Sequence, residues 1–150
     1  MGIKSFQGKQ LGEVIVSENI TVGDFMTENM YKFYEGQNVI EVMETLLRHQ
    51  ISGGPVVNEQ NELIGIISEG DCIKQISESR YYNQPMENMT VENYMIKEVE
   101  TVSPDMHLFD VANKFLSLKK RRFPVCKHGK LIGLISQKDV LKAALEEAKV

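Results

Sequence analysis

Apolar residues recur at helical spacing in two segments of the chain. The first segment follows Asn38, and Glu41 three residues later completes the pattern of a capping box. The second follows Ser103, Pro104 and Asp105. The apolar positions on one helical face are Val39, Val42, Met43, Leu46 and Leu47 in the first segment, and Leu108, Val111, Phe115 and Leu118 in the second. This spacing predicts two amphipathic helices.

Each of these helices is followed by a pattern typical of a β-hairpin. A short apolar run around 55–57 and a polar turn at 58–61 precede a second apolar run, LIGII, at 63–67. The second copy has its polar turn at 127–130 and its last apolar run, LIGLI, at 131–135. We therefore predict two hairpins.

Two further elements complete each copy. A second helix is expected from Glu69 in the first copy and from Gln137 in the second. A short strand is expected before each amphipathic helix, at 30–33 and at 99–102. The predicted order of elements in each copy is therefore β-α-β-β-α.

The two sets of elements are copies of one repeated sequence, offset by about 69 residues. ITVGDFM at 20–26 aligns with MTVENYM at 89–95, and LIGIISEGD at 63–71 aligns with LIGLISQKD at 131–139 after one gap in the turn. The predicted organisation is an N-terminal extension at 1–19, repeat one at 20–76, a linker at 77–88, repeat two at 89–145 and a C-terminal tail at 146–150.

The repeat also indicates the fold class, which is α+β. The small sheet of one repeat has an apolar face that this repeat cannot cover by itself. We therefore expect the two β-α-β-β-α units to pack sheet to sheet with pseudo-two-fold symmetry, which buries both apolar faces.

The composition of the 150-residue chain narrows the possible functions. Its hydrophobic fraction of 42% and charged fraction of 25% are typical of a soluble globular protein. A formal net charge of -4 disfavours general nucleic-acid binding, which usually requires a basic surface. The sequence has no apolar stretch of bilayer-spanning length, and its two cysteines lack a CxxC spacing. We expect a reduced, cytoplasmic protein with no membrane contact.

An enzymatic function is disfavoured by the polar residues of the chain. The three histidines, His49, His107 and His128, are expected at helix ends or in a turn, without partners that form a catalytic triad or a metal site. The sequence has neither a P-loop nor a GxGxxG motif. We therefore predict no catalytic residues and no metal ligands.

A serine and an aspartate three residues later follow the last strand of each copy. The pairs are Ser68 with Asp71 and Ser136 with Asp139. In a structural interpretation, each pair caps a helix N-terminus and satisfies its free N–H groups. In a functional interpretation, the helix N-terminus attracts an anion and the carboxylate accepts hydrogen bonds from neighbouring hydroxyls, as in a ribose. The two residues alone leave both interpretations open.

Together these motifs resemble a tandem pair of CBS domains, also called a Bateman module. The resemblance rests on TVGDFM and TVENYM, the amphipathic helices, GPVV and FPVC, and the two LIGxISxxD motifs, and it covers nearly all of 20–145. The chain is similar in particular to small stand-alone bacterial CBS-domain proteins. The resemblance implies the β-α-β-β-α repeats described above and a homodimer shaped as a flat disc.

The resemblance also implies an adenosine-containing ligand, with AMP, ADP, ATP and S-adenosylmethionine as candidates and no required cofactor. In the family's motif the Asp holds the ribose hydroxyls, the Ser lies near the ribose or phosphate, and a Thr before the first strand borders the nucleoside. The complete set of candidate nucleotide-binding residues is Thr21, Ile51, Ser52, Ser68 and Asp71 in repeat one, and Thr90, Arg121, Arg122, Phe123, Ser136, Lys138 and Asp139 in repeat two.

The largest difference between the copies lies just before the hairpin proline. Repeat two has KKRRF at 119–123, whereas repeat one has QISGG at 50–54, and Lys138 replaces Gly70. Arginine binds phosphate through a planar fork, so we expect phosphate in repeat two, while Glu69 repels it in repeat one. Alternatively, the basic run is the exposed start of a strand. Phe123 can pack on a base or occupy a core position.

The predicted function is a regulatory module that senses an adenosine-containing ligand, as in energy sensing. The ligand would bind in the cleft between the CBS repeats and the signal would pass to a separate effector protein. The alternative is a ligand-independent scaffold whose paired sheets serve only for dimerisation. DNA binding is disfavoured because CBS repressors carry an added winged-helix domain, for which this chain has no room.

Overall fold

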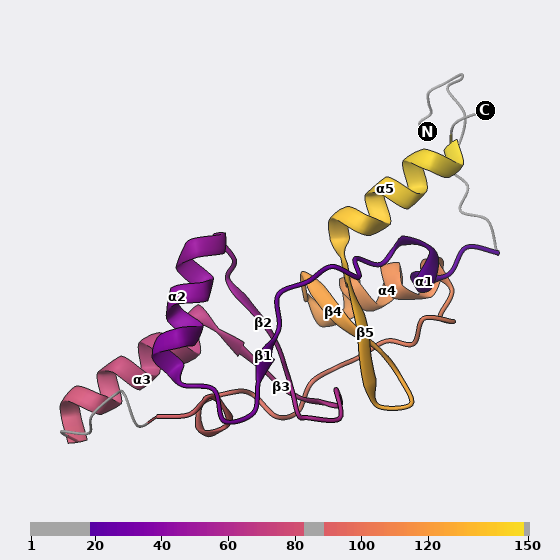
Figure 1. The fold of residues 1–150 in the computed structure, drawn as a ribbon. Coiled ribbons are helices and arrows are strands. Elements are labelled where there is room, and N and C mark those ends of the chain that lie inside the picture. The colour runs from indigo at the N-terminus through magenta and orange to yellow at the C-terminus, as the bar shows by residue number, and fades with distance from the viewer. Residues whose placement is uncertain (1–18, 83–88, 149–150) are drawn as a thin grey trace, which may run out of the picture. The chain divides into compact units, whose positions relative to one another are not determined.

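The computed structural model describes residues 19–82 and 89–148, and Figure 1 shows the order of their elements. Repeat one contains β1 (Phe33–Tyr34), α2 (Val39–His49), β2 (Gly53–Val57), β3 (Leu63–Ser68) and α3 (Glu69–Tyr82). Repeat two contains α4 (Leu108–Leu118), β4 (Arg122–Lys127), β5 (Lys130–Ser136) and α5 (Gln137–Ala148). These helices and two small sheets confirm the predicted α+β class.

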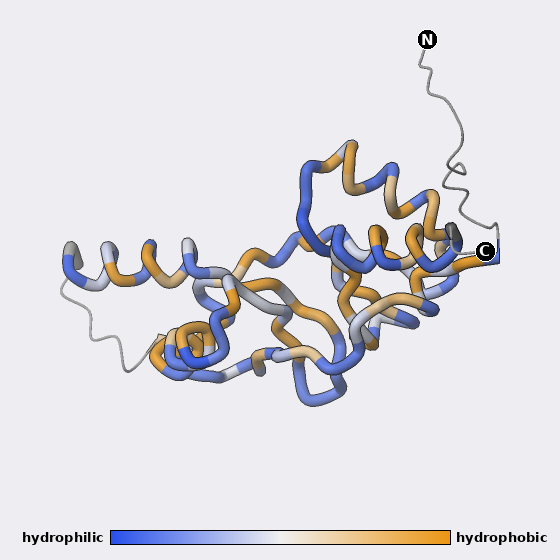
Figure 2. Tube along the Cα trace, turned by 90° about the horizontal axis from the view of Figure 1, so that it is seen from above, coloured by the Kyte–Doolittle hydropathy of each residue, from blue (hydrophilic) through white to orange (hydrophobic). Residues whose placement is uncertain are grey.

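Both amphipathic helices form where their apolar spacing predicted them, but Leu47 and Leu118, which were expected on the apolar face, are 78% and 41% exposed. The side chain of Asn38 caps α2 by accepting a hydrogen bond from the Ile40 N–H at 2.7 Å. Both helices end at a residue in the left-handed conformation, Gln50 after α2 and Lys119 after α4. Figure 2 shows hydrophobic and hydrophilic residues alternating along the helices, as one buried and one exposed face require.

The strands that precede these helices are shorter than predicted. Residues Phe33–Tyr34 form β1 and pair with β2 in parallel, Phe33 opposite Val56. In repeat two, Val102 and Val125 form only a single parallel bridge. The hairpin strands β2 and β3 pair antiparallel, with Gly53 opposite Ser68, and β4 pairs with β5.

Two short helical turns and the end of one helix were not anticipated from the sequence. The repeated TV motifs form short helical turns, α1 (Val22–Phe25) and η2 (Val91–Asn93). Helix α3 continues to Tyr82, so the first part of the segment interpreted as a linker, 77–88, is helical. The remainder of that linker, nearly all of the N-terminal extension at 1–19 and the end of the tail at 146–150 lie outside the described residues.

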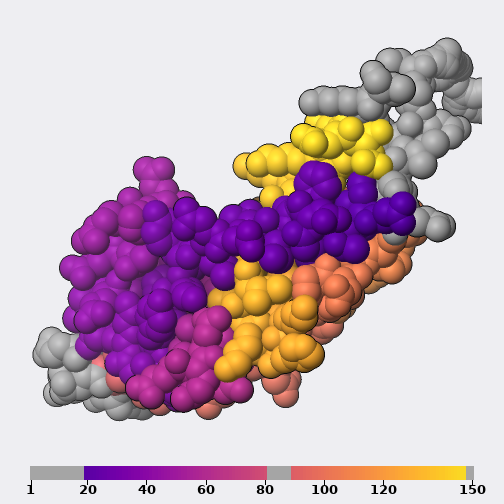
Figure 3. Space-filling model, turned by 45° about the vertical axis from the view of Figure 1, so that its right-hand side comes forward, coloured from indigo at the N-terminus to yellow at the C-terminus, as the bar shows by residue number. Residues whose placement is uncertain are grey.

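Each compact unit of the structure combines parts of both repeats. Unit 1 contains the described residues up to Glu28 together with Val102–Val125 and the described residues from Gly133 onward. Unit 2 contains the described residues of Asn29–Thr101 together with Cys126–Ile132. Figure 3 shows the indigo N-terminal segment directly against the orange and yellow elements of repeat two. The first segment of each repeat therefore folds onto the other repeat.

Backbone hydrogen bonds hold these exchanged segments in place. In unit 1, Thr27 and Leu134 exchange two N–H···O bonds of 2.7 and 2.9 Å. In unit 2, Ile96 and Ile66 exchange the equivalent bonds, of 2.8 and 2.9 Å. Each exchanged segment is thereby added to the last strand of the other repeat.

The turn of the second hairpin is also held in unit 2. The Leu131 N–H donates to the Asn61 carbonyl at 3.0 Å, and the Leu63 N–H donates to the Gly129 carbonyl at 3.2 Å. The two hairpin turns are therefore hydrogen-bonded to each other, which explains why Cys126–Ile132 belongs to unit 2.

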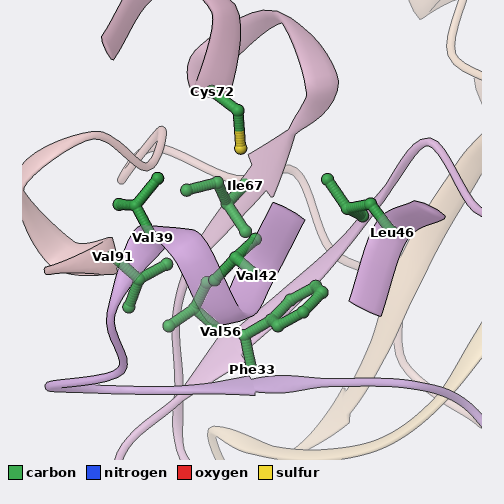
Figure 4. Close-up of a cluster of buried hydrophobic side chains, with 8 residues drawn as sticks. All are labelled: Phe33, Val39, Val42, Leu46, Val56, Ile67, Cys72 and Val91. Atoms are coloured by element: carbon green, nitrogen blue, oxygen red, sulfur yellow. The ribbon is translucent and has the colours of Figure 1, made fainter. Parts of the chain in front are cut away.

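Each unit has its own apolar core, to which the exchanged segment contributes a valine. In unit 2 the side chains from α2, β1, β2, β3 and α3 point toward one another and toward Val91 of repeat two (Figure 4). In unit 1, Val22 of repeat one is fully buried. The other buried side chains of unit 1 include Leu108, Val111, Phe115, Phe123, Val125, Ile135 and Ala143. Burial of these apolar side chains is the main favourable term in folding each unit.

The exchanged segments cross the last strands at glycines. A Cβ atom on Gly133 would lie 2.8 Å from the Met26 sulfur and 3.0 Å from the Thr27 carbonyl oxygen. A Cβ atom on Gly65 would lie 2.5 Å from the Met95 sulfur and 2.8 Å from the Ile96 carbonyl oxygen. The glycine of each LIG motif is therefore required by this close approach.

We predict that Gly65→Ala lowers the free energy of unfolding by about 1 to 3 kcal/mol, because the added methyl group overpacks against backbone that cannot move freely. Denaturant unfolding measures the change. Gly70→Ala is the matched control, since its Cβ would lie 3.7 Å from the Ser68 hydroxyl oxygen and alanine favours a helix. Equal stability of wild type and Gly65→Ala would contradict the close crossing.

Candidate functional site

Both Ser–Asp pairs form reciprocal caps at helix N-termini. At α5, the Asp139 Oδ2 atom accepts from the Ser136 N–H at 2.8 Å and from its hydroxyl at 3.0 Å, and the Ser136 hydroxyl accepts from the Asp139 N–H at 3.2 Å. At α3, Ser68 and Asp71 make the same three contacts at 2.9, 3.0 and 3.4 Å. The structural interpretation therefore holds in both copies. Each cap uses only the Oδ2 atom of its aspartate carboxylate.

The second oxygen of Asp139 faces a residue of the exchanged segment. The Thr27 hydroxyl lies 3.5 Å from Asp139 Oδ1, at the outer limit of a hydrogen bond, and only 8% of Asp139 is exposed. The residue equivalent to Thr27 in repeat two is Ile96, which has no hydroxyl and is exposed. Thr27 was not identified from the sequence, although it directly follows the TVGDFM motif and differs between the copies.

The basic run of repeat two lies beside the N-terminus of α5. The Gln137 N–H, the first of this helix, donates to the Arg121 carbonyl at 3.1 Å, and the Gln137 side-chain amide donates to the Lys120 carbonyl at 2.9 Å. The side chains of Lys120, Arg121, Arg122 and Lys138 are all exposed. Four cationic residues therefore lie at or next to the N-terminus that the Ser136–Asp139 pair caps, within unit 1.

The equivalent position in unit 2 has the opposite electrostatic character. The Glu69 N–H donates to the Ser52 carbonyl at 2.8 Å, so Ser52 occupies the place that Arg121 has in unit 1. Burial raises the pKa of the Cys72 thiol, and the carboxylates of Asp71 and Glu69 raise it further. For Cys126, burial alone raises the pKa. The start of α3 is therefore a region of negative potential.

Phe123 occupies a core position, one of its two anticipated places. Only 1% of it is exposed, and its ring centroid lies 4.7 Å from that of Phe115. A comparison of the two repeats explains why Phe123 is buried. A Cβ atom on Gly54 would lie 3.1 Å from the Phe33 ring, so Gly54 leaves room for Phe33, whereas repeat two places Phe123 and the smaller Val102 at these two positions. Each unit thus fills this space with one phenylalanine.

The remaining candidate residues lie at helix ends or at the edge of the core. Thr21 caps α1, its hydroxyl donates to Asp24 at 3.2 Å, and its backbone pairs with His107 at the start of α4. Thr90 directly precedes η2 without a side-chain capping hydrogen bond, its hydroxyl accepts from the Asn93 side-chain amide at 3.1 Å, and its backbone pairs with Asn38 at the start of α2. Ile51 packs against the core of unit 2. The hydroxyls of Thr21 and Thr90 therefore contact their own short helical turns, whereas their backbones pair with the residues that precede the amphipathic helices.

The described residues, 19–82 and 89–148, contain neither a cluster of metal-ligating side chains nor a helix that could span a membrane. Within these ranges, His, Cys, Asp and Glu side chains form no group of three or more that could hold a metal ion. No helix in the same ranges has both the length and the apolar character of a membrane span.

The family model of the CBS domain matches the chain twice, at residues 22–78 and 91–146. The chain is 32% identical to Uncharacterized protein MJ1225 of Methanocaldococcus jannaschii over 124 residues, which are 83% of this chain and 42% of that protein. It thus spans less than half of that relative. It is 30% identical to an uncharacterized 17.7 kDa protein of Acidianus ambivalens over 126 residues, covering 83% of this chain and 73% of that protein.

Solved structures show the same fold. The crystal structure of CBSX2 from Arabidopsis thaliana in complex with AMP has a TM-score of 0.73 and 31% identity, covering 84% of this chain and 96% of that one. The CBS domain pair of MJ0100, in complex with 5'-methylthioadenosine and S-adenosyl-L-methionine, has a TM-score of 0.66 and 22% identity, covering 82% and 94%. Since the family model covers both copies of the repeat, the chain belongs to the CBS-domain family and carries a tandem pair of CBS domains.

Proposed function

We propose that this protein is a regulatory module that binds an adenosine-containing ligand in unit 1 and passes the signal to a separate effector protein. The observation that carries this proposal is that three exposed cationic residues, Arg121, Arg122 and Lys138, lie at or next to the helix N-terminus that the Ser136–Asp139 pair caps. The AMP complex of CBSX2, at 31% identity, supports the class of ligand.

The residues of this site suit the two polar parts of a nucleotide. The guanidinium groups of Arg121 and Arg122 can bind phosphate oxygens in a fork, and the N-terminus of α5 adds a favourable dipole. Asp139 can accept from the ribose hydroxyls through Oδ1, the oxygen that the cap leaves unused. The Thr27 hydroxyl next to this oxygen can donate to or accept from the same ribose.

Unit 2 is expected to bind such ligands more weakly. Glu69 and Asp71 oppose a phosphate at the start of α3, and Ile96 stands where unit 1 has Thr27. A nucleoside without phosphate fits Ser52, Ser68 and Asp71 better than a nucleotide does, because it brings no negative charge to this acidic position.

Regulation in this proposal requires binding but no chemistry. AMP, ADP, ATP and S-adenosylmethionine are the candidate ligands, no cofactor is required, and the protein acts in the cytoplasm as an energy sensor. A ligand that prefers one conformation shifts the population toward it, and the effector protein responds to that conformation.

We also propose a homodimer formed through the helical faces of the two units. Leu47 on α2 and Leu116 on α4 occupy equivalent positions and are each 78% exposed. Ile73 on α3 and Leu141 on α5 are likewise equivalent, at 65% and 64%. Helix α2 contacts α3 and α4 contacts α5, so each unit can present these exposed apolar side chains on neighbouring helices, which is typical of an interaction surface. Because equivalent apolar residues are exposed on both units, a second copy of the chain can pair its own helical faces with them.

We predict that the purified protein binds AMP and that Arg122→Ala and Asp139→Ala each weaken binding about tenfold or more, the effect of losing one charge-assisted hydrogen bond. Isothermal titration calorimetry with AMP, ATP and S-adenosylmethionine measures the dissociation constants. Asp71→Ala is the matched control, because it removes the equivalent cap in unit 2. We expect it to change the AMP dissociation constant less than twofold.

Two results would refute this assignment. If none of the three ligands gives saturable heat or raises the melting temperature, the protein is the ligand-independent scaffold. If Asp71→Ala abolishes AMP binding and Asp139→Ala does not, the site lies in unit 2.

We predict that light scattering on a sizing column gives twice the chain mass of 17.1 kDa for the wild type, and a lower mass for Leu116→Glu. The glutamate places a charge in the proposed apolar interface, where its desolvation is unfavourable. Glu59→Ala, at an exposed turn residue, is the control and should remain dimeric. A monomeric wild type would refute the dimer.

A further inference from the structure

Helix α3 places a polar side chain in the interior of unit 2. Gln75 is fully buried, and neither its amide nitrogen nor its amide oxygen has a hydrogen-bond partner among the described residues. Most buried polar groups in folded proteins are paired. Burial of an unpaired amide costs free energy, because its hydrogen bonds to water are lost without replacement. Gln75 therefore destabilises the packed position of α3.

The equivalent position in unit 1 carries no polar group. The two LIGxISxxD motifs align Gln75 with Ala143 of α5, which is also fully buried. Both helices directly follow the last strand of a repeat and begin with the same Ser–Asp cap. Alanine fills this position without any unpaired side-chain atom. The fold thus requires a buried residue here but no amide.

The buried side of α3 is polar, whereas aliphatic residues lie on its exposed side. Among residues 69–80, only Cys72 and Gln75 are buried. Ile73 and Ile76 are 65% and 45% exposed. Most of the stability of a helix in a protein comes from the packing of its apolar face. Because α3 contributes only a small thiol and an amide to the buried interior, its contacts with α2 and β3 provide little of this stabilisation.

Hydrogen bonds fix the first turn of α3. The Glu69 N–H donates to the Ser52 carbonyl at 2.8 Å, and the Ser68–Asp71 cap joins the helix to the end of β3. The Lys74–Glu78 ion pair, with an N···O distance of 4.0 Å, joins two residues of α3 itself, so it does not hold the helix to the rest of unit 2. The helix can therefore separate beyond its first turn while the cap remains in place.

We propose that α3 separates from unit 2 beyond its first turn in a minor conformation, in which water hydrates the Gln75 amide. Separation restores the hydrogen bonds of this amide and exposes little apolar side chain, so α3 opens more readily than α5. A ligand or an effector protein that prefers one of the two conformations shifts the population toward it. The opening requires no ligand, so its test is independent of the ligand site proposed in unit 1.

The first test is native-state hydrogen exchange of the full chain, measured residue by residue by NMR. We expect the backbone amides of 73–78 to exchange about tenfold or more faster than the equivalent amides of 141–146, the effect of one unpaired amide group. Gln75→Met keeps the length and helix propensity of the side chain without the amide, so it should slow exchange at 73–78 about tenfold.

Two results of this experiment would overturn the proposal. One is exchange at 73–78 as slow as at 141–146 in the wild type, and the other is a Gln75→Met variant in which exchange at 73–78 is not slowed. Lys74→Met is the matched control, because Lys74 is an exposed residue of the same helix. It should change the exchange rates about twofold at most, since an exposed ion pair contributes little. Equal slowing by both variants would also contradict a role of the buried amide.

The second test needs no variant, so it decides even if Gln75→Met fails to fold. Cys72 is a free, buried thiol three residues before Gln75, on the same side of α3. Opening exposes this thiol, so iodoacetamide added to the native wild type at about pH 8 should label Cys72 faster than the whole chain unfolds. Mass spectrometry locates the label, and circular dichroism gives the rate of global unfolding. Labelling of Cys72 at the rate of global unfolding would refute the separate opening of α3.

Discussion

Two pairs of backbone hydrogen bonds, Thr27 with Leu134 and Ile96 with Ile66, determine how the rest of the structure is built. They add the first segment of each repeat to the last strand of the other, so neither repeat completes a core by itself. The glycines of both LIG motifs follow from this crossing, and so do the valines that the exchanged segments bury. The contact of Thr27 with Asp139 exists for the same reason.

Local features of this fold could be predicted from the sequence, and long-range ones could not. The amphipathic helices, the hairpins and the Ser–Asp caps depend on residues a few positions apart, so periodicity and turn chemistry suffice. The exchange of segments depends on pairing between distant strands, which leaves no periodic signal. Thr27 was missed for this reason. Phe123 could not be assigned from its residue type, since only the packing of Phe33 over Gly54 shows why repeat two needs an aromatic side chain there.

The two copies agree where the fold requires it and differ where chemistry is possible. Both keep the serine cap, the LIG glycine and the buried valines. At the start of the second helix, however, unit 1 is basic and unit 2 is acidic. At the start of the amphipathic helix, unit 1 has His107 and unit 2 has Asn38. Both differences leave the backbone hydrogen bonds intact, so the two units carry different side-chain chemistry within one shared framework.

The most direct test of the account is an amide NMR titration of the labelled full chain with AMP, because it reports each candidate residue separately. The account predicts that the shifts concentrate on Thr27, on Arg121 and Arg122, and on Ser136–Asp139 at the start of α5. Shifts that concentrate instead on Ser52 and on Ser68–Asp71, or a spectrum that AMP leaves unchanged, would contradict the assignment of the ligand to the basic N-terminus in unit 1.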